Sequence, residues 1–98
     1  LHHEGVTAVL CENDEVAFFV NMCCESLSIR VPEEMSITGF DNIEWATTGN
    51  ASLTTIDQNF EQIGLEIAAL LTSSSYKPRH INVPIRLVPR ASTTQTNN

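Results

Sequence analysis

Residues 31–42, Val-Pro-Glu-Glu-Met-Ser-Ile-Thr-Gly-Phe-Asp-Asn, predict a sharp turn, a buried strand and a carboxylate at the end of that strand. Pro32 fixes its own φ and has no backbone N–H, which predicts a turn ahead of a short strand over residues 35–38. Gly39 permits the backbone to bend after that strand, and Asp41 then stands at the strand's carboxyl end. In open α/β sheets, ligands bind in the crevice outside the carboxyl ends of the strands. Asp41 is therefore a candidate ligand-binding residue.

A second strand end of the same kind lies earlier in the chain. Residues 6–11 are mostly apolar and predict a strand, which the polar run 12–15 and a helix to about Ser28 follow. Asn13 is well placed to cap that helix, where the neighbouring carboxylates also favour its dipole. We interpret Asn13 as a helix cap, a ligand contact, or both at once.

The first helix is apolar on two sides. One stripe at helical spacing consists of Val16, Val20, Cys23 and Leu27. Phe18 and Met22 form a second stripe, which a single core contact would not cover. Either this helix lies between a sheet and another element of its own fold, or its second stripe meets a partner subunit.

The second half of the chain predicts a further helix and a closing strand. Residues 42–52 are expected to form an exposed loop, and a helix is expected to begin near residues 57–59 with one core-facing apolar side. Within it, Gly64 predicts a close backbone approach. Residues 81–87 alternate as a half-buried strand, and the polar tail over 91–98 is expected to be largely disordered.

Composition limits the function. The 98 residues suffice for one modest core, and a formal charge of −7 argues against direct binding of nucleic-acid phosphates. The three cysteines lack the spacing of a disulfide framework or a metal site, so we expect them buried as small hydrophobes in a reducing compartment. No run is long enough to span a membrane. A strand begins almost directly after Leu1, which suggests a piece excised from a longer protein.

Four blocks of the sequence resemble the lactose- and galactose-repressor (LacI/GalR) family of bacterial transcription regulators. They are Thr-Ala-Val-Leu…Asn-Asp-Glu-Val-Ala in 7–17, the block 31–42, Leu-Thr-Thr-Ile-Asp-Gln-Asn-Phe in 53–60, and Val-Pro…Leu-Val-Pro-Arg-Ala-Ser-Thr in 83–93. Nearly the whole chain is covered.

The resemblance implies an α/β fold, namely part of a periplasmic-binding-protein-like type I fold with a parallel sheet flanked by helices. Such proteins have two subdomains, joined by three crossing segments, with an effector between them. Residues 1–52 would belong to the C-terminal subdomain and 53–75 to the N-terminal subdomain. Residues 76–98 would form the return crossing, the closing strand and the polar tail.

The resemblance also implies which residues contact the effector. Asn13 and Asp41 match positions that hydrogen-bond the effector, and Phe60 matches one that packs against it. An amide, a carboxylate and a flat apolar wall suit a neutral polyol or base. Trp45 either covers a sugar face or anchors its loop, and Gln58 is a weaker candidate contact.

The partners follow from the same resemblance. It implies a dimer whose interface includes Phe18 and Met22, a small-molecule effector that resembles a sugar or a nucleobase, and DNA contact only through a domain outside these residues. The unpaired cysteines favour a cytoplasmic protein, the absence of catalytic motifs argues against catalytic activity, and no cofactor is expected. Because the missing subdomain parts would leave apolar faces uncovered, we expect the 98-residue chain to self-associate.

Three other functions would suit parts of this sequence. A phosphoryl-transfer enzyme would hold Mg²⁺ with Asp14 and Asp41, but there is no glycine-rich phosphate loop, and the only lysine is Lys77 in a connector. A periplasmic sugar-binding protein is closer, yet the block 31–42 and the unpaired cysteines favour the regulator. The third is a structural or oligomerising fragment that binds no ligand.

Overall fold

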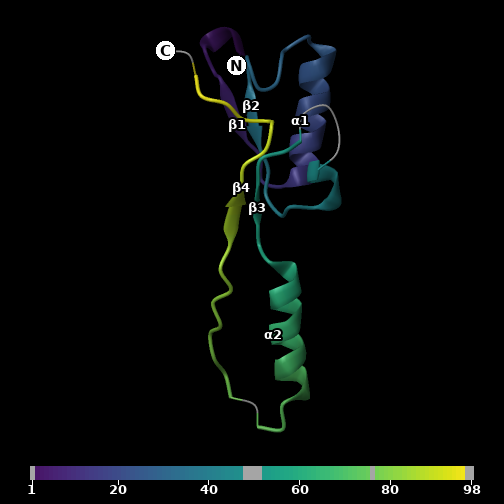
Figure 1. The fold of residues 1–98 in the computed structure, drawn as a ribbon, viewed down its shortest axis with the longest axis vertical. Helices are drawn as coiled ribbons and strands as arrows, with labels where there is room; N and C mark the ends of the chain where they lie inside the picture. The colour runs from purple at the N-terminus through teal and green to yellow at the C-terminus, as the bar shows by residue number, and fades with distance from the viewer. Residues whose placement is uncertain (1, 48–51, 76, 97–98) are drawn as a thin grey trace.

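The chain forms two parts joined by a pair of strands. The computed structural model describes residues 2–47, 52–75 and 77–96. Figure 1 shows the elements in chain order, which are η1 (His2–Glu4), β1 (Ala8–Leu10), α1 (Asp14–Ser26), β2 (Ser36–Thr38), η2 (Glu44–Thr47), β3 (Thr55–Asp57), α2 (Phe60–Thr72) and β4 (Arg86–Val88). None of the helices in these ranges is long and apolar enough to cross a membrane.

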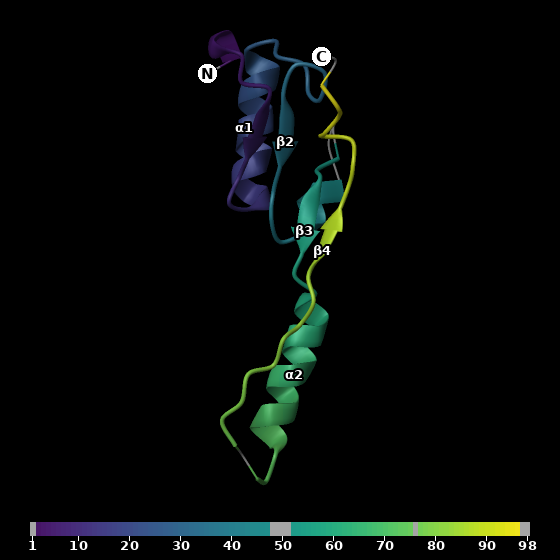
Figure 2. The ribbon, with the colours of Figure 1, turned by 90° about the vertical axis from the view of Figure 1, so that its left-hand side faces the viewer.

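The molecule is elongated. It measures 58 × 25 × 18 Å with a radius of gyration of 17.6 Å, whereas a compact domain of this length has a radius of about 13 Å. Figure 2 shows why: α1, β1 and β2 pack together at one end, while α2 and the returning chain project from them at the other. The core therefore lies in one end only.

The two parts contain different sheets. β1 and β2 pair in parallel, with Val9 opposite Ile37, and α1 is the crossover between them. β3 and β4 pair antiparallel, with Ile56 opposite Leu87. A parallel bridge between Thr38 and Thr54 connects the two sheets. This α/β arrangement agrees with the fold class that the sequence predicts.

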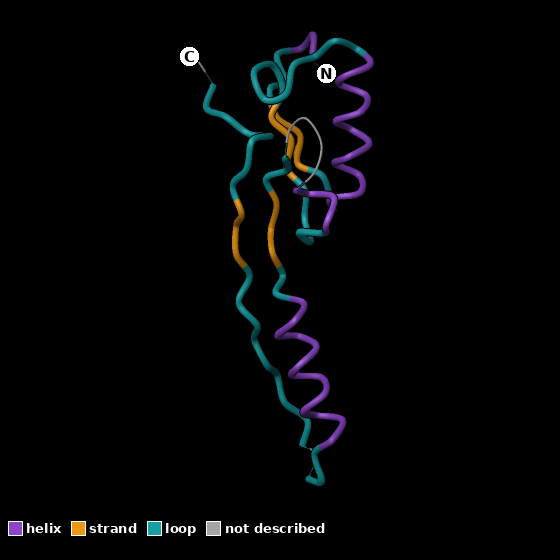
Figure 3. The backbone as a smooth tube through the Cα atoms, turned by 45° about the vertical axis from the view of Figure 1, so that its right-hand side comes forward, coloured by secondary structure: helices purple, strands orange, loops and turns teal. Residues whose placement is uncertain are grey.

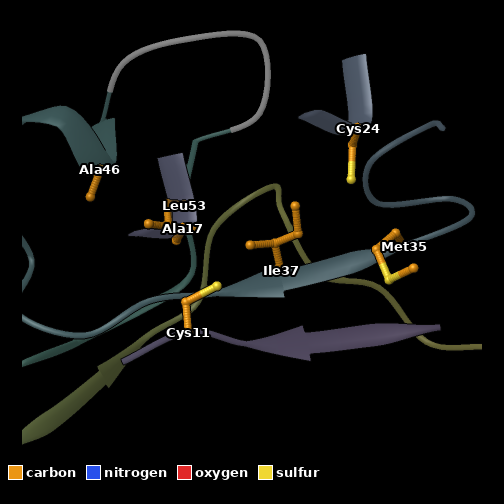
Figure 4. Packing of buried hydrophobic residues seen from close by; sticks show 7 residues of the cluster. All are labelled: Cys11, Ala17, Cys24, Met35, Ile37, Ala46 and Leu53. Atoms are coloured by element: carbon orange, nitrogen blue, oxygen red, sulfur yellow. The ribbon is translucent and has the colours of Figure 1, made fainter. Parts of the chain in front are cut away.

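The core lies between α1 and the β1–β2 pair. Ile37 of β2 is fully buried, and Ala17 of α1 is also inaccessible to solvent. Figure 4 shows the cluster, whose members are Cys11, Ala17, Cys24, Met35, Ile37, Ala46 and Leu53. Burial raises the pKa of the Cys11 and Cys24 thiols, because the interior disfavours a thiolate.

The buried stripe of α1 differs from the expected one. Ala17 and Cys24 face the core, whereas Cys23 is exposed and Leu27 is 70% exposed. Of the expected stripe, Val20 does pack against the core, but Val16 is 40% exposed, and the expected burial of Cys23 and Leu27 was wrong. Asp14 explains the difference, because its buried carboxylate fixes which side of the helix faces inward. The helix itself ends at Ser26, close to the predicted Ser28.

The expectation of a core-facing second helix was wrong for these residues. α2 has no buried residue, Leu71 is 80% exposed, and an added Cβ at Gly64 would have no neighbour within 4 Å. Figure 3 shows α2 accompanied only by the returning chain. The apolar pattern predicted the helix correctly but not its exposure among the described residues.

Three predictions of irregular or extended structure also need correction. The strand predicted over 81–87 covers only Arg86–Val88, in part because Pro84 has no N–H for a ladder. The predicted loop 42–52 contains the short helix η2, whose Ala46 is buried. Residues 48–51 lie outside the described ranges. The tail is not disordered throughout, because Ser92 is 2% exposed.

Ser92 joins the tail to both sheets. Its Oγ donates to the carbonyl oxygen of Ile37 at 2.5 Å and accepts from the backbone N–H of Thr54 at 2.8 Å. The carbonyl oxygen of Ser92 accepts from the N–H of Ile37 at 2.9 Å. The tail is thus held beside β2 by hydrogen bonds to Ile37.

Replacement of Ser92 by alanine should lower the free energy of unfolding by about 1–3 kcal/mol, because the buried N–H of Thr54 loses its acceptor. Urea unfolding followed by circular dichroism measures the change. Ser26→Ala, on the exposed end of α1, is the control and should change stability by less than about 0.5 kcal/mol. Equal stability of the two variants would contradict the role of Ser92.

Candidate functional site

Polar side chains follow β1, β2 and β3 at the point where each strand ends. The backbone brings these ends together: Asp14 N donates to Phe40 O, and Asp41 N donates to Ile56 O, each at 2.9 Å. The segments after three strands therefore meet at one place, where the carboxyl ends of the parallel pair lie.

Asn13 caps α1 as the sequence predicts. It has an extended backbone with φ −156°, and its Oδ1 accepts from Val16 N at 2.8 Å. This satisfies one of the first N–H groups of the helix, which have no partner within the helix itself. The cap uses one of the two acceptor lone pairs of Oδ1, and the amide Nδ2 is the donor that Asn13 can offer to a ligand.

Asp41 and Gln58 are brought together by the structure. Gln58 Nε2 donates to Asp41 Oδ1 at 2.5 Å, although the two residues belong to different strand ends. Both side chains are half-buried. Asp41 has φ 111° and Asn42 has φ 58°, so two successive residues adopt a conformation that side chains other than glycine rarely take. This contact orients the carboxylate of Asp41.

For the other predicted contacts, the structure gives their elements and, where described, their exposure. Phe60 is the first residue of α2, directly after the polar segment, and its side chain is 54% exposed. Trp45 belongs to η2, but its side chain lies outside what the structure describes. Phe18 and Met22 lie on α1 and are 37% and 46% exposed.

Four polar residues at this place were not predicted as site residues. Asp57 is central: its Oδ1 accepts from Asn59 N at 2.7 Å, and its Oδ2 lies 3.3 Å from Asn42 Nδ2 and 3.5 Å from Arg86 Nη2. The Asn59 N–H, followed by Asn42 and Arg86, holds the pKa of Asp57 below its usual value. The other three are Asp14, Asn42 and Arg90.

Arg90 crosses from the last strand to the polar segments. Its Nη2 donates to Asn42 Oδ1 at 2.7 Å and its Nη1 donates to Leu53 O at 2.9 Å. A basic residue directly after a closing strand was the signal in the sequence, but its partners are 48 and 37 residues away. Local patterns cannot identify contacts at such separations.

Asp14 is the most buried of these carboxylates, at 1% exposure. Its Oδ1 accepts from Thr55 Oγ1 at 2.5 Å and its Oδ2 accepts from Ile43 N at 2.8 Å. Both oxygens are thus engaged by protein donors, which argues against the rival in which Asp14 and Asp41 share Mg²⁺. Across the described ranges, no group of three or more His, Cys, Asp and Glu residues is arranged to hold a metal ion.

Known proteins match this chain closely. The family model for a periplasmic binding protein-like domain matches residues 2–93. The HTH-type transcriptional repressor PurR of Yersinia enterocolitica is 36% identical over 90 residues, which cover 88% of this chain and 26% of that protein. The chain therefore spans about a quarter of the length of this curated relative.

Two solved structures of transcription regulators are also similar to this chain. A LacI family transcriptional regulator from Enterococcus faecium, with bound ribose, matches with a TM-score of 0.79 at 30% identity and covers 89% of this chain and 34% of that structure. A LacI-type transcription regulator from Bifidobacterium animalis subsp. lactis matches with a TM-score of 0.82 at 30% identity, covering 91% and 33%. The chain belongs to the family of periplasmic-binding-protein-like domains, and it corresponds to part of the effector-binding domain of LacI-family transcription regulators.

Proposed function

We propose that this chain is part of the small-molecule-sensing domain of a cytoplasmic, DNA-binding transcription regulator. The observation that carries the proposal is the meeting of the polar segments after β1, β2 and β3, where Asp41 and Gln58 are in contact. The similar relatives are transcriptional regulators rather than enzymes, and one of them is described with bound ribose.

The chemistry of this place suits a neutral polar ligand. Asn13 offers an amide donor, Asp41 offers a carboxylate acceptor whose orientation Gln58 fixes, and Phe60 offers a half-exposed aromatic face at the start of α2. A hydroxyl-rich sugar or a nucleobase can donate to the carboxylate and accept from the amide. We propose Asn13, Asp41, Gln58, Phe60 and Trp45 as effector contacts.

The regulator would act by a shift between two arrangements of its subdomains. An effector changes such an equilibrium only by its difference in affinity for the two arrangements. In a dimer with Phe18 and Met22 at its interface, that shift would change the spacing of two DNA-binding heads outside these residues. The sequence of the gene upstream of Leu1 separates this proposal from its rival: a basic helix-turn-helix supports the regulator, and a basic segment followed by an apolar one supports a periplasmic sugar binder.

Two substitutions at Asn13 separate ligand binding from helix capping. Asn13→Ser keeps a good cap but removes the amide donor, whereas Asn13→Ala removes both and should cost about 1 kcal/mol of stability. In the full-length protein, Asn13→Ser should weaken binding of the effector about tenfold and leave the unfolding free energy nearly unchanged.

Isothermal titration calorimetry with D-ribose and with adenine measures the binding, and thermal unfolding measures the cap. An Asn13→Ser variant that binds the active probe as tightly as the wild type would show that Asn13 is a cap only. Failure of the wild-type protein to bind either probe would exclude ribose and adenine as effectors.

A further inference from the structure

The segment 40–43 carries the candidate ligand-binding carboxylate in a costly backbone conformation. Asp41 and Asn42 both have positive φ, at 111° and 58°. Positive φ is uncommon for residues with a Cβ, and although Asp and Asn tolerate it better than most, two such residues in succession point to surrounding contacts that hold them.

Asp14 holds both ends of that segment. Its backbone N–H donates to Phe40 O at 2.9 Å, and its Oδ2 accepts from Ile43 N at 2.8 Å. The two positive-φ residues are therefore enclosed between two hydrogen bonds to a single residue. Asp14 itself is fixed, because α1 begins with it and Thr55 Oγ1 donates to its Oδ1 at 2.5 Å.

The neighbourhood is built around this carboxylate. Thr55 has no exposed surface, and Asp14 is 1% exposed. An added Cβ at Gly39 would meet Asp14 Oδ1 and would lie 3.0 Å from Asp14 Cα. The glycine therefore provides the space that the carboxylate occupies. The positive φ values fall on Asp41 and Asn42 rather than on Gly39.

We propose that Asp14 is a positioning residue for the ligand site: by bonding both ends of segment 40–43, it sets the backbone conformation that presents the Asp41 carboxylate beside Gln58. The inference rests on the proposed function, since it gives Asp14 a role in effector binding without any contact to the effector. Through its hydrogen bond with Thr55, Asp14 also links the site to β3, the strand that leads into α2.

Three variants test the proposal. Asp14→Ala removes both side-chain bonds. Asp14→Asn can keep both, because its oxygen can accept from Ile43 N while its amide donates to the Thr55 hydroxyl, which can also accept. Glu15→Ala is the matched control, since Glu15 is an exposed carboxylate in the same first helical turn and its loss also removes a favourable interaction with the helix dipole.

The first readout needs no ligand. Residue-level hydrogen–deuterium exchange in the 98-residue chain compares the amides of Asp41 and Ile43 with that of Cys11, which bonds Thr38 O at 2.9 Å. In Asp14→Ala, exchange at Asp41 and Ile43 should accelerate at least tenfold relative to Cys11. Asp14→Asn and Glu15→Ala should exchange as the wild type does. Equal changes at all three amides, or none, would overturn the proposal.

Thr55→Val is the second variant, in case Asp14→Ala does not fold. It removes the hydroxyl that fixes Asp14 Oδ1 and keeps the size of the side chain. Exchange at Ile43 should again accelerate while exchange at Cys11 stays unchanged, and an unchanged Ile43 amide would overturn the proposal.

The second readout is the affinity of the full-length protein for D-ribose. Asp14→Ala should weaken binding about tenfold, with Asp14→Asn restoring it. Weak binding in Asp14→Asn as well, with normal exchange, would overturn the role of Asp14 in binding. If the wild type does not bind ribose but the exchange pattern is as expected, ribose is not the effector and the positioning of segment 40–43 stands.

Discussion

Gly39→Ala is expected to lower the free energy of unfolding by about 2–5 kcal/mol, which combines overpacking with the loss of buried hydrogen bonds. The new Cβ would overlap Asp14 Oδ1 and would lie 2.8 Å from Leu53 Cδ2. Asp14 cannot move away easily, because its Cα is 3.0 Å from the Cβ position and belongs to the first turn of α1. Displacing the carboxylate would leave the N–H of Ile43 and the hydroxyl of Thr55 without their acceptor.

Gly64→Ala is the matched control for this prediction. It makes the same chemical change in α2, where nothing lies within 4 Å of the new Cβ, and alanine is favoured over glycine in a helix by about 1 kcal/mol. Urea unfolding at one fixed protein concentration should therefore show changes of opposite sign. A loss of less than about 1 kcal/mol in Gly39→Ala would mean that the chain relaxes around the methyl group at little cost.

The parts of the site that could be predicted from sequence are those set by neighbouring residues. The cap at Asn13 depends on an N–H three residues away, and the structure confirms it. The placement of Asp41 after a strand follows from the local pattern of residues 35–41, and the structure confirms this too. The parallel βαβ unit follows from two short apolar strands with a helix between them.

The parts that could not be predicted depend on contacts between distant residues. The first-turn position of Asp14 predicts only a favourable interaction with the helix dipole, because its partners Ile43 and Thr55 are 29 and 41 residues away. Ser92 was assigned to a disordered tail for the same reason, since its bonds reach Ile37 and Thr54. A polar residue in a polar run carries no local signal of burial.

The apolar face of α2 illustrates a different limit. The spacing of its apolar residues predicted a helix and a buried side, and the helix is present at Phe60–Thr72. Periodicity identifies an apolar face of a helix but does not say which residues pack against that face. Here the face is exposed in the described part of the chain, so the pattern predicted the helix but not its exposure.

The 98-residue chain alone is expected to self-associate at micromolar concentration. It exposes 7266 Å², whereas a folded monomer of 10.8 kDa exposes about 5,500 Å². The excess of about 1,700 Å² is roughly twice what each partner buries in a standard protein interface. Large apolar side chains contribute to it at both ends of the molecule, among them Phe19 and Met22 on α1 and Leu65, Ile67 and Leu71 on α2.

Light scattering after size exclusion should therefore give a mass above 10.8 kDa. Ile67→Glu with Leu71→Glu tests the α2 face, and Met22→Glu tests the α1 face. Gln95→Glu is the control, because it adds a negative charge to a chain of formal charge −7 at an exposed polar position. The variant that restores the monomer identifies the face that associates, since a charge in an apolar interface loses its hydration. A wild-type chain that stays monomeric would show that these apolar faces remain exposed to water without driving association.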